Sequence, residues 1–181
     1  ENLIRASKGG YAIPAINTQG GNFDIIWAVC QAAEELKSPI MLAHYVSTGA
    51  YSGNDWFVEV CKWCGSRVSV PVSIHLDHGD SFELCKSCID GGFTSVMIDA
   101  SKLPYEENIA ITQKVCEVAH LANVSVESEL GTIGTTGNSI EGGTTGIIYT
   151  DPDQAKDFVE KTGIDTLAVP IGTAQAILKQ T

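Results

Sequence analysis

Basic side chains are scarce in this sequence. Its 181 residues include 11 Lys and Arg against 22 Asp and Glu, which gives a formal net charge of −11 at pH 7. Nucleic-acid binding needs basic surface that neutralises phosphates, so we expect no nucleic-acid partner. No apolar run approaches the roughly 18 to 20 residues that a membrane-spanning helix needs, so we expect no membrane partner either.

The sequence also lacks the signals of secretion. It has no signal-peptide pattern and opens on Glu1 rather than Met, so we expect further residues before it. Its six cysteines fall mostly in segments of helical apolar spacing, which favours buried, reduced thiols over a disulfide framework. Two pairs, Cys61 with Cys64 and Cys85 with Cys88, have zinc half-site spacing, but zinc ribbons usually hold such pairs on tight turns. Reduced thiols predict a cytoplasmic protein.

Strand-like and helix-like segments alternate along the chain. Strands separated by single helices predict right-handed crossovers and a parallel sheet. We expect strands at 11–17, 38–44, 68–74 with a polar end at 75–78, 95–99, 124–130 and 166–171. We expect helices at 23–36, 55–64, 81–90, 103–122, 152–161 and 174–179.

The loop after the first strand decides between two parallel architectures. An open, doubly wound sheet usually carries a glycine phosphate loop there, and Gln19-Gly-Gly-Asn22 has neither the dinucleotide nor the Walker spacing. Polar groups at the ends of most strands favour the α/β (β/α)₈ barrel instead. We predict one barrel domain over residues 1–181 that lacks its last two βα units, because six are present. We also expect a gap in the sequence after Ala174.

The segment Ser73–Phe82 carries the strongest chemical signal. It places two imidazoles and a carboxylate at the end of an apolar strand. Side chains alternate along a strand, so His75 and Asp77 share one face while His78 takes the other. Histidine suits Zn²⁺, and an adjacent carboxylate can act as a base toward a metal-bound substrate. The alternative is a hydrogen-bonded His–Asp pair at a strand end.

Other strand ends also carry polar side chains. Asn17 ends the first strand and Ser47 lies in a Gly/Ser loop after the second, where each can reach a substrate hydroxyl or phosphate. Turn capping is an equally open role for both. Asp99 and Glu129 end the fourth and fifth strands, and Asp99 can alternatively cap the next turn.

For the other three histidines the sequence favours, or leaves open, a role outside catalysis and metal binding. His44 ends the second strand and His120 lies in a predicted helix, and we interpret both as structural or solvated side chains. For His75, orientation of the rim and packing inside the barrel stay equally open.

Six segments in chain order strongly resemble class II, metal-dependent ketose-bisphosphate aldolases, the fructose- and tagatose-bisphosphate aldolases. The segments are Tyr11-Ala-Ile-Pro-Ala-Ile-Asn17, His75-Leu-Asp-His-Gly79, Gly92-Phe-Thr-Ser-Val-Met-Ile-Asp-Ala-Ser101, Pro104-Tyr-Glu-Glu-Asn108, Val124-Ser-Val-Glu-Ser-Glu-Leu-Gly131 and Tyr149-Thr-Asp-Pro152. The resemblance implies a zinc-dependent (β/α)₈ barrel of glycolysis, a homodimer or homotetramer. It cleaves a ketose 1,6-bisphosphate, a small phosphorylated sugar, to dihydroxyacetone phosphate and an aldehyde phosphate.

The resemblance also implies roles for individual residues. His78 matches a catalytic zinc ligand, and Asp77 matches the acid/base that exchanges a proton with the substrate hydroxyl. Asp99 and Glu129 match carboxylates near a second cation, divalent or monovalent. Gly172 matches a substrate-binding glycine.

Glu141 is our candidate for a missing acid. It lies in the Gly/Thr-rich loop 131–146, which lacks the family's usual Glu-Asp pair. We expect that loop to act as a lid over the rim.

Two departures from the family leave an alternative open. The family's Gly-Thr-x-His-Gly supplies a second zinc ligand, whereas Gln175 stands at that position here, and the later His-Gly-x-Ser-Gly is absent. Catalytic zinc uses about three protein ligands. The alternative is a non-catalytic aldolase-like barrel that binds sugar phosphate or serves as a partner subunit.

Overall fold

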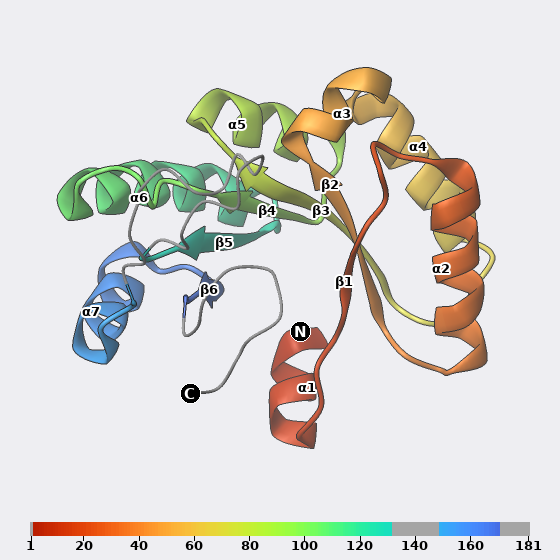
Figure 1. Cartoon of the computed structure of the whole chain (residues 1–181), viewed down its shortest axis with the longest axis horizontal. Helices are drawn as coiled ribbons and strands as arrows, with labels where there is room; N and C mark the ends of the chain where they lie inside the picture. The colour runs from red at the N-terminus through yellow and green to blue at the C-terminus, as the bar shows by residue number, and fades with distance from the viewer. Residues whose placement is uncertain (1, 132–148, 171–181) are drawn as a thin grey trace, which may run out of the picture. The chain divides into compact units, whose positions relative to one another are not determined.

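Helices and strands alternate along the chain (Figure 1), as the sequence predicts. The computed structural model describes residues 2–131 and 149–170. Over these ranges the helices are α1 (Asn2–Gly9), α2 (Phe23–Glu35), α3 (Val46–Ser52), α4 (Asn54–Gly65), α5 (Phe82–Gly91), α6 (Tyr105–Leu121) and α7 (Pro152–Thr162). The strands are β1 (Ala15–Asn17), β2 (Ile40–Tyr45), β3 (Val72–Gly79), β4 (Ser95–Ile98), β5 (Ser125–Glu129) and β6 (Thr166–Ala168).

The strands follow one another in the sheet in their order along the chain, β1 to β6. β2 pairs in parallel with β1 and β3, and β6 pairs in parallel with β5. A parallel neighbour requires a crossover, and each crossover here contains a helix. The predicted α/β class is therefore confirmed. No helix in the described ranges is both long enough and apolar enough to cross a membrane.

The chain divides into two compact units. The first unit comprises Glu1–Gly79 with Ser87–Val96, and the second comprises Asp80–Lys86 with Met97–Thr181. The boundary falls inside β4, so each unit holds half of that strand.

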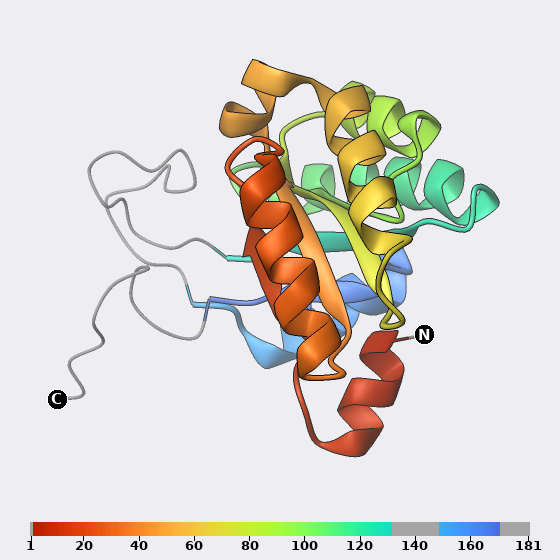
Figure 2. The ribbon, with the colours of Figure 1, turned by 90° about the vertical axis from the view of Figure 1, so that its right-hand side faces the viewer.

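In the first unit, α2 and α4 lie side by side, in contact with each other (Figures 1 and 2). Asn22 begins α2, since its side chain accepts a hydrogen bond from the Ile25 backbone N–H at 3.1 Å. The buried faces of the two helices carry Ile26 and Cys30 from α2 and Phe57 from α4. These side chains, together with those of β2, form the core of this unit.

In the second unit, α6 packs against both β5 and α7. α7 has strong local end signals. Asp151 caps its first turn, Pro152 occupies the first helical position, and Gly163 ends it with a left-handed backbone, φ 72°. Phe158 of α7 and Val126 of β5 are fully buried.

The structure departs from the predicted elements in several places. α1 was not predicted, and α3 occupies the predicted Gly/Ser loop. β1 begins at Ala15 rather than at residue 11, and β6 ends at Ala168 rather than at residue 171. The predicted helix 174–179 lies outside the described residues. Ser, Thr and Gly are poor helix formers, so α3 depends on tertiary contacts that its sequence does not display.

The start of β3 was also predicted too early, at residue 68. Ser69 instead turns toward α2, where its backbone N–H donates to the Glu34 carboxylate at 2.6 Å. The strand begins only at Val72, after Pro71, which has no N–H to donate to a sheet.

Candidate active site

The end of β3 emerges from a buried strand. His75 and Leu76 are buried, whereas Asp77 and His78 are half-buried. His75 Nδ1 lies 2.9 Å from Ser95 Oγ. Burial, with the neighbouring His78 as a smaller cause, lowers the pKa of His75 to about 4. His75 is thus a neutral, packed side chain, one of the two roles that the sequence left open.

His78 has an unusual backbone. Its φ is +53°, in the left-handed region that side chains other than glycine rarely adopt. Such strained positions cluster at functional sites. The Tyr45 ring meets the His78 ring edge to face at 6.1 Å, and Tyr45 is opposite Asp77 in the β2–β3 register. Sequence reasoning missed Tyr45, whose only signal is its place directly after the predicted strand 38–44; in the structure it is the last residue of β2.

Asn17 and Ser47 lie on two other segments of the first unit. Asn17 Oδ1 accepts a hydrogen bond from the Gln19 backbone N–H at 2.8 Å, which is the turn-capping geometry. Ser47 lies in α3 with an exposed side chain. The Asn17 amide therefore lies at the carboxyl end of β1, and the Ser47 hydroxyl lies just after the carboxyl end of β2.

In the second unit, Asp99 and Glu129 come together. A carboxylate oxygen of Asp99 lies within 4.8 Å of one of Glu129. Asp99 Oδ1 accepts hydrogen bonds from Ser101 N at 3.2 Å and Ser101 Oγ at 2.7 Å. The turn-capping role of Asp99 is therefore real, and it orients the carboxylate beside Glu129.

A buried polar chain supports the end of β5. Asn108 Nδ2 donates to the Glu129 backbone carbonyl at 3.0 Å. Thr112 Oγ1 donates to Asn108 Oδ1 at 3.2 Å and lies 3.1 Å from Ser128 Oγ. Sequence reasoning gave Asn108 no role, although a polar residue on the apolar face of a helix was a usable signal.

The whole chain, residues 1–181, matches the family model described as "Fructose-bisphosphate aldolase class-II". The chain belongs to this family. The fructose-bisphosphate aldolase of Staphylococcus epidermidis is 46% identical over 184 residues, covering 99% of this chain. The probable fructose-bisphosphate aldolase of Bacillus subtilis is also 46% identical over 99% of this chain. This chain spans 62% of the length of each of these relatives.

Solved aldolase structures share the fold. The YdjI aldolase from Escherichia coli K12 is 33% identical, with a TM-score of 0.81 over 98% of this chain and 61% of its own. The putative fructose-1,6-bisphosphate aldolase from Coccidioides immitis is 29% identical, with a TM-score of 0.84 over 97% of this chain and 61% of its own. The predicted barrel class, with six βα units present, is confirmed.

Several residues that the resemblance to class II aldolases singled out lie outside the residues that the structure describes. These are Glu141, Gly172 and Gln175. His120 lies in α6, where its Nε2 is 3.0 Å from Asp165 Oδ2, and His44 is buried. Of the predicted structural or solvated roles, His44 has the first, as a packed interior side chain, whereas His120 is exposed and paired with Asp165.

The cysteines confirm the predicted buried helical positions. All six are buried, and none of them forms a disulfide. Burial raises the pKa of Cys88 to about 12, and burial with Asp165 nearby raises that of Cys116 to about 11. Among the described residues, no group of three potential metal ligands includes a cysteine.

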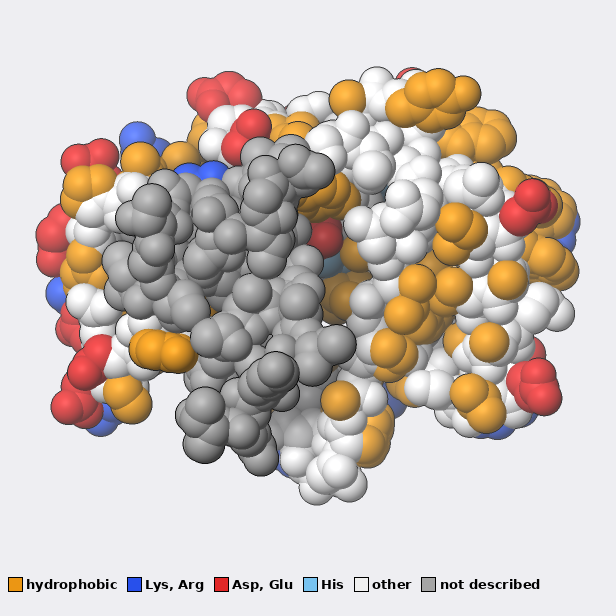
Figure 3. Space-filling view, in the orientation of Figure 1, with side chains coloured by type: hydrophobic (Ala, Val, Ile, Leu, Met, Phe, Trp, Pro, Cys, Tyr) orange, Lys and Arg blue, Asp and Glu red, His pale blue; other side chains and the backbone are white. Residues whose placement is uncertain are grey.

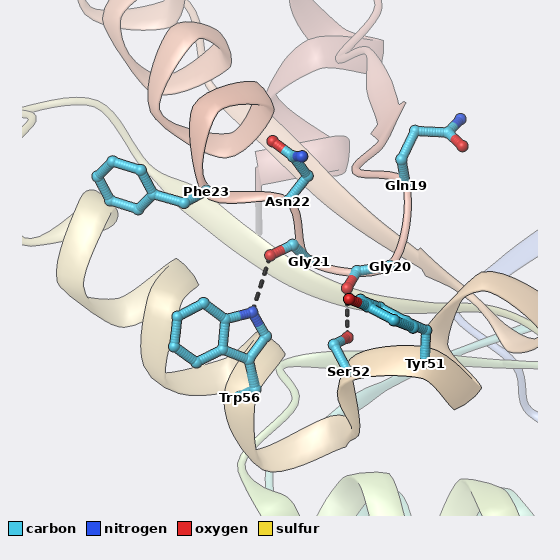
Figure 4. Close-up of a pocket in the computed structure, with 8 residues that line it drawn as sticks. All are labelled: Gln19, Gly20, Gly21, Asn22, Phe23, Tyr51, Ser52 and Trp56. Carbon is cyan, nitrogen blue, oxygen red and sulfur yellow. Dashed lines mark hydrogen bonds between the residues drawn. The ribbon is translucent and has the colours of Figure 1, made fainter.

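A shallow pocket lies beside the end of β1 (Figure 4). The Gln19–Phe23 loop forms one side, and Tyr51, Ser52 and Trp56 form the other. Trp56 Nε1 donates to the Gly21 carbonyl at 2.9 Å, and Ser52 Oγ donates to the Gly20 carbonyl. These bonds tie the β1–α2 loop to α3 and α4.

Proposed function

We propose that this chain supplies the acid/base and a zinc ligand of a metal-dependent ketose-bisphosphate aldolase. One observation carries the proposal: Asp77 and His78 end a buried strand of a class II family member, and His78 has a left-handed backbone. The substrate is a ketose 1,6-bisphosphate, which is cleaved to dihydroxyacetone phosphate and an aldehyde phosphate. Fructose 1,6-bisphosphate is the first candidate, because relatives 46% identical are named for it.

The available donors suit metal ions. His78 offers an imidazole, a preferred ligand of zinc, which we propose as the catalytic metal. The Asp99 and Glu129 oxygens, within 4.8 Å of each other, are like charges whose approach favours a cation. We propose that they hold the second cation, divalent or monovalent. Bound zinc supplies Lewis-acid polarisation of the substrate carbonyl, and we expect its other ligands outside the described residues.

The chain's own side chains act on the substrate as follows. Asp77 accepts the proton of the hydroxyl beside the bond that breaks, and returns it in the condensation direction. Asn17, Ser47 and Gly172 bind the substrate. Glu141 acts as a further acid.

The non-catalytic alternative rests only on Gln175 and the absent later motifs. The names and 46% identity of the relatives support an enzyme instead. We therefore keep aldol cleavage as the proposal.

The proposal extends to the cellular location and the partners of the protein. Six buried cysteines, none of them in a disulfide, support a reducing, cytoplasmic location. Acidic side chains, with Lys and Arg side chains among them, line the left-hand edge of Figure 3 over α6 and α7, and the formal net charge of −11 supports the expectation of no nucleic-acid partner. We propose one barrel domain and a homodimer or homotetramer for the whole protein.

The first test removes the acid/base. In the full-length protein with zinc, Asp77→Ala should abolish ketose-bisphosphate cleavage while elemental analysis finds the metal retained. Asp80→Ala is the matched control, because Asp80 is an exposed carboxylate three residues away and should keep normal turnover. Near-normal turnover of Asp77→Ala would contradict the role of Asp77.

The second test removes the metal ligand. His78→Ala should lose zinc and activity together, whereas the exposed His120→Ala should keep both. Chelator should stop wild-type cleavage across a panel of fructose and tagatose phosphates. Wild-type protein that cleaves none of them with zinc present would contradict the proposed function.

A further inference from the structure

His44 lies at the end of β2 beneath α3. It is 1% exposed, and its ring stacks on Phe57 with centroids 4.2 Å apart and planes 22° apart. The Phe93 ring meets the His44 ring edge to face, with centroids 5.9 Å apart, and lies 5.5 Å from the Phe57 ring. The imidazole is therefore held in one orientation by a helix and a loop of the first unit.

α3 rests directly on this ring through Gly49. A Cβ built on Gly49 would lie 2.8 Å from the ring carbons Cδ2 and Cε1 of His44 and closer still to Nε2. Real Cβ atoms essentially never approach other heavy atoms so closely. Only glycine thus permits α3 to sit at this height above β2.

An imidazole ring is an unfavourable side chain to bury at this position. The Asn54 side chain interacts with the ring, but neither ring nitrogen has a hydrogen bond of good geometry within the described part of the chain. A buried polar group without partners costs free energy that an apolar side chain would not. The feature that His44 supplies to α3 is its flat surface.

A second contact holds α3 from the side. A Cβ built on Gly20 would lie 3.0 Å from the Thr48 carbonyl carbon, and Ser52 Oγ donates to the Gly20 carbonyl (Figure 4). Thr48 Oγ1 donates back to Tyr45 O at 3.1 Å. A helix of 7 residues is marginal by itself, so such contacts decide where it lies.

We propose that His44 is a positioning residue, the surface on which α3 rests and through which Ser47 is held for the phosphorylated substrate. The inference rests on the proposed function, because the role of Ser47 belongs to it. Ser47 precedes Gly49 by two residues in the same helical turn. A shift of α3 away from His44 therefore moves the Ser47 hydroxyl.

Kinetics of the full-length, zinc-loaded protein test this. Gly49→Ala pushes α3 off the ring and should raise KM for the ketose bisphosphate about tenfold, with a smaller fall in kcat. Gly91→Ala is the matched control, since a Cβ there meets nothing within 4 Å, and its kinetics should equal wild type. His44→Ala removes the surface itself and should also raise KM, because α3 loses its support; a wild-type KM for His44→Ala would overturn the inference.

A double-mutant cycle separates positioning from general damage. In a Ser47→Ala background, Gly49→Ala should change KM less than twofold, because the displaced hydroxyl is already absent. A KM for Gly49→Ala equal to that of Gly91→Ala, or an undiminished effect in the Ser47→Ala background, would overturn the inference.

Hydrogen exchange supplies a readout that needs no activity. The amides of α3 should exchange faster in His44→Ala than in wild type, while α7 amides stay unchanged. Unchanged exchange in α3 would overturn the inference even if the enzyme cleaves normally. Absence of wild-type cleavage, by contrast, would overturn the proposed function.

Discussion

Two buried polar side chains brace the candidate site. His75 lies 2.9 Å from Ser95 Oγ, and Asn108 donates to the carbonyl of Glu129 at 3.0 Å. Each is nearly inaccessible, at 3% and 2% exposed. Because a buried polar group is costly without its partner, each contact specifies one arrangement of the backbone beside it.

His75 should make the metal-free protein sensitive to acid. Its folded pKa is about 4, below the usual 6.5, so protons bind the unfolded chain more readily between these values. The contribution of His75 to the free energy of unfolding is therefore fully present above pH 6.5 and is lost as the pH falls toward 4. Denaturant unfolding in chelator should show wild type losing about 2 kcal/mol more than His75→Gln between pH 7 and pH 5. Parallel pH profiles would contradict the burial of a neutral His75.

Asn108→Ala should destabilise the second unit. It removes the hydrogen bonds that Asn108 makes with the buried Glu129 carbonyl and with the Thr112 hydroxyl, at a cost of about 1–3 kcal/mol. It should also weaken divalent-cation binding measured by calorimetry, because the end of β5 loses its support. Gln113→Ala, an exposed position on the same helix, is the control and should cost about 0.5 kcal/mol or less.

At the scale of elements, α3 and α7 are held in opposite ways. α7 has its own start and stop signals in Asp151, Pro152 and Gly163. α3 has no side-chain cap and depends on Gly49 and Gly20 meeting other parts of the fold. Local sequence signals thus predict α7 but not α3.

The cap of α7 is directly testable. Asp151 Oδ1 accepts from the backbone N–H groups of Asp153 at 2.9 Å and Gln154 at 3.0 Å. Asp151→Ala should lower stability by about 1 kcal/mol, measured by denaturant unfolding, whereas Asp151→Asn keeps an acceptor and should cost clearly less. Equal losses in the two variants would mean that the charge, not the cap, is the stabilising feature.

At the scale of the molecule, the two units share β4. Ser95 and Val96 belong to the first unit, and Met97 and Ile98 to the second. Neither unit holds the complete strand. This division bears on the prediction of one domain over residues 1–181, since a split strand opposes independent unfolding.

Two optical probes can test that prediction in the full-length protein. All three tryptophans, Trp27, Trp56 and Trp63, lie in the first unit, so their fluorescence follows it when no other tryptophan is present. Far-ultraviolet circular dichroism follows the helices of both units. We expect the two denaturation curves to coincide, as in one cooperative transition. Tryptophans outside residues 1–181 should first be replaced by Phe, and separated midpoints would contradict a single domain.

The sequence by itself determined the βα alternation, the parallel class, the family and the strand ends that carry Asp77, His78, Asp99 and Glu129. These follow from local periodicity, end signals and motifs, which depend on residues close in the chain. It did not determine α3, the late start of β3 or the role of Asn108. Those depend on contacts between residues far apart in sequence, Gly49 on His44 and Ser69 on Glu34 among them. Only the tertiary structure decides which distant groups meet, because close packing and hydrogen-bond satisfaction act in space rather than along the chain.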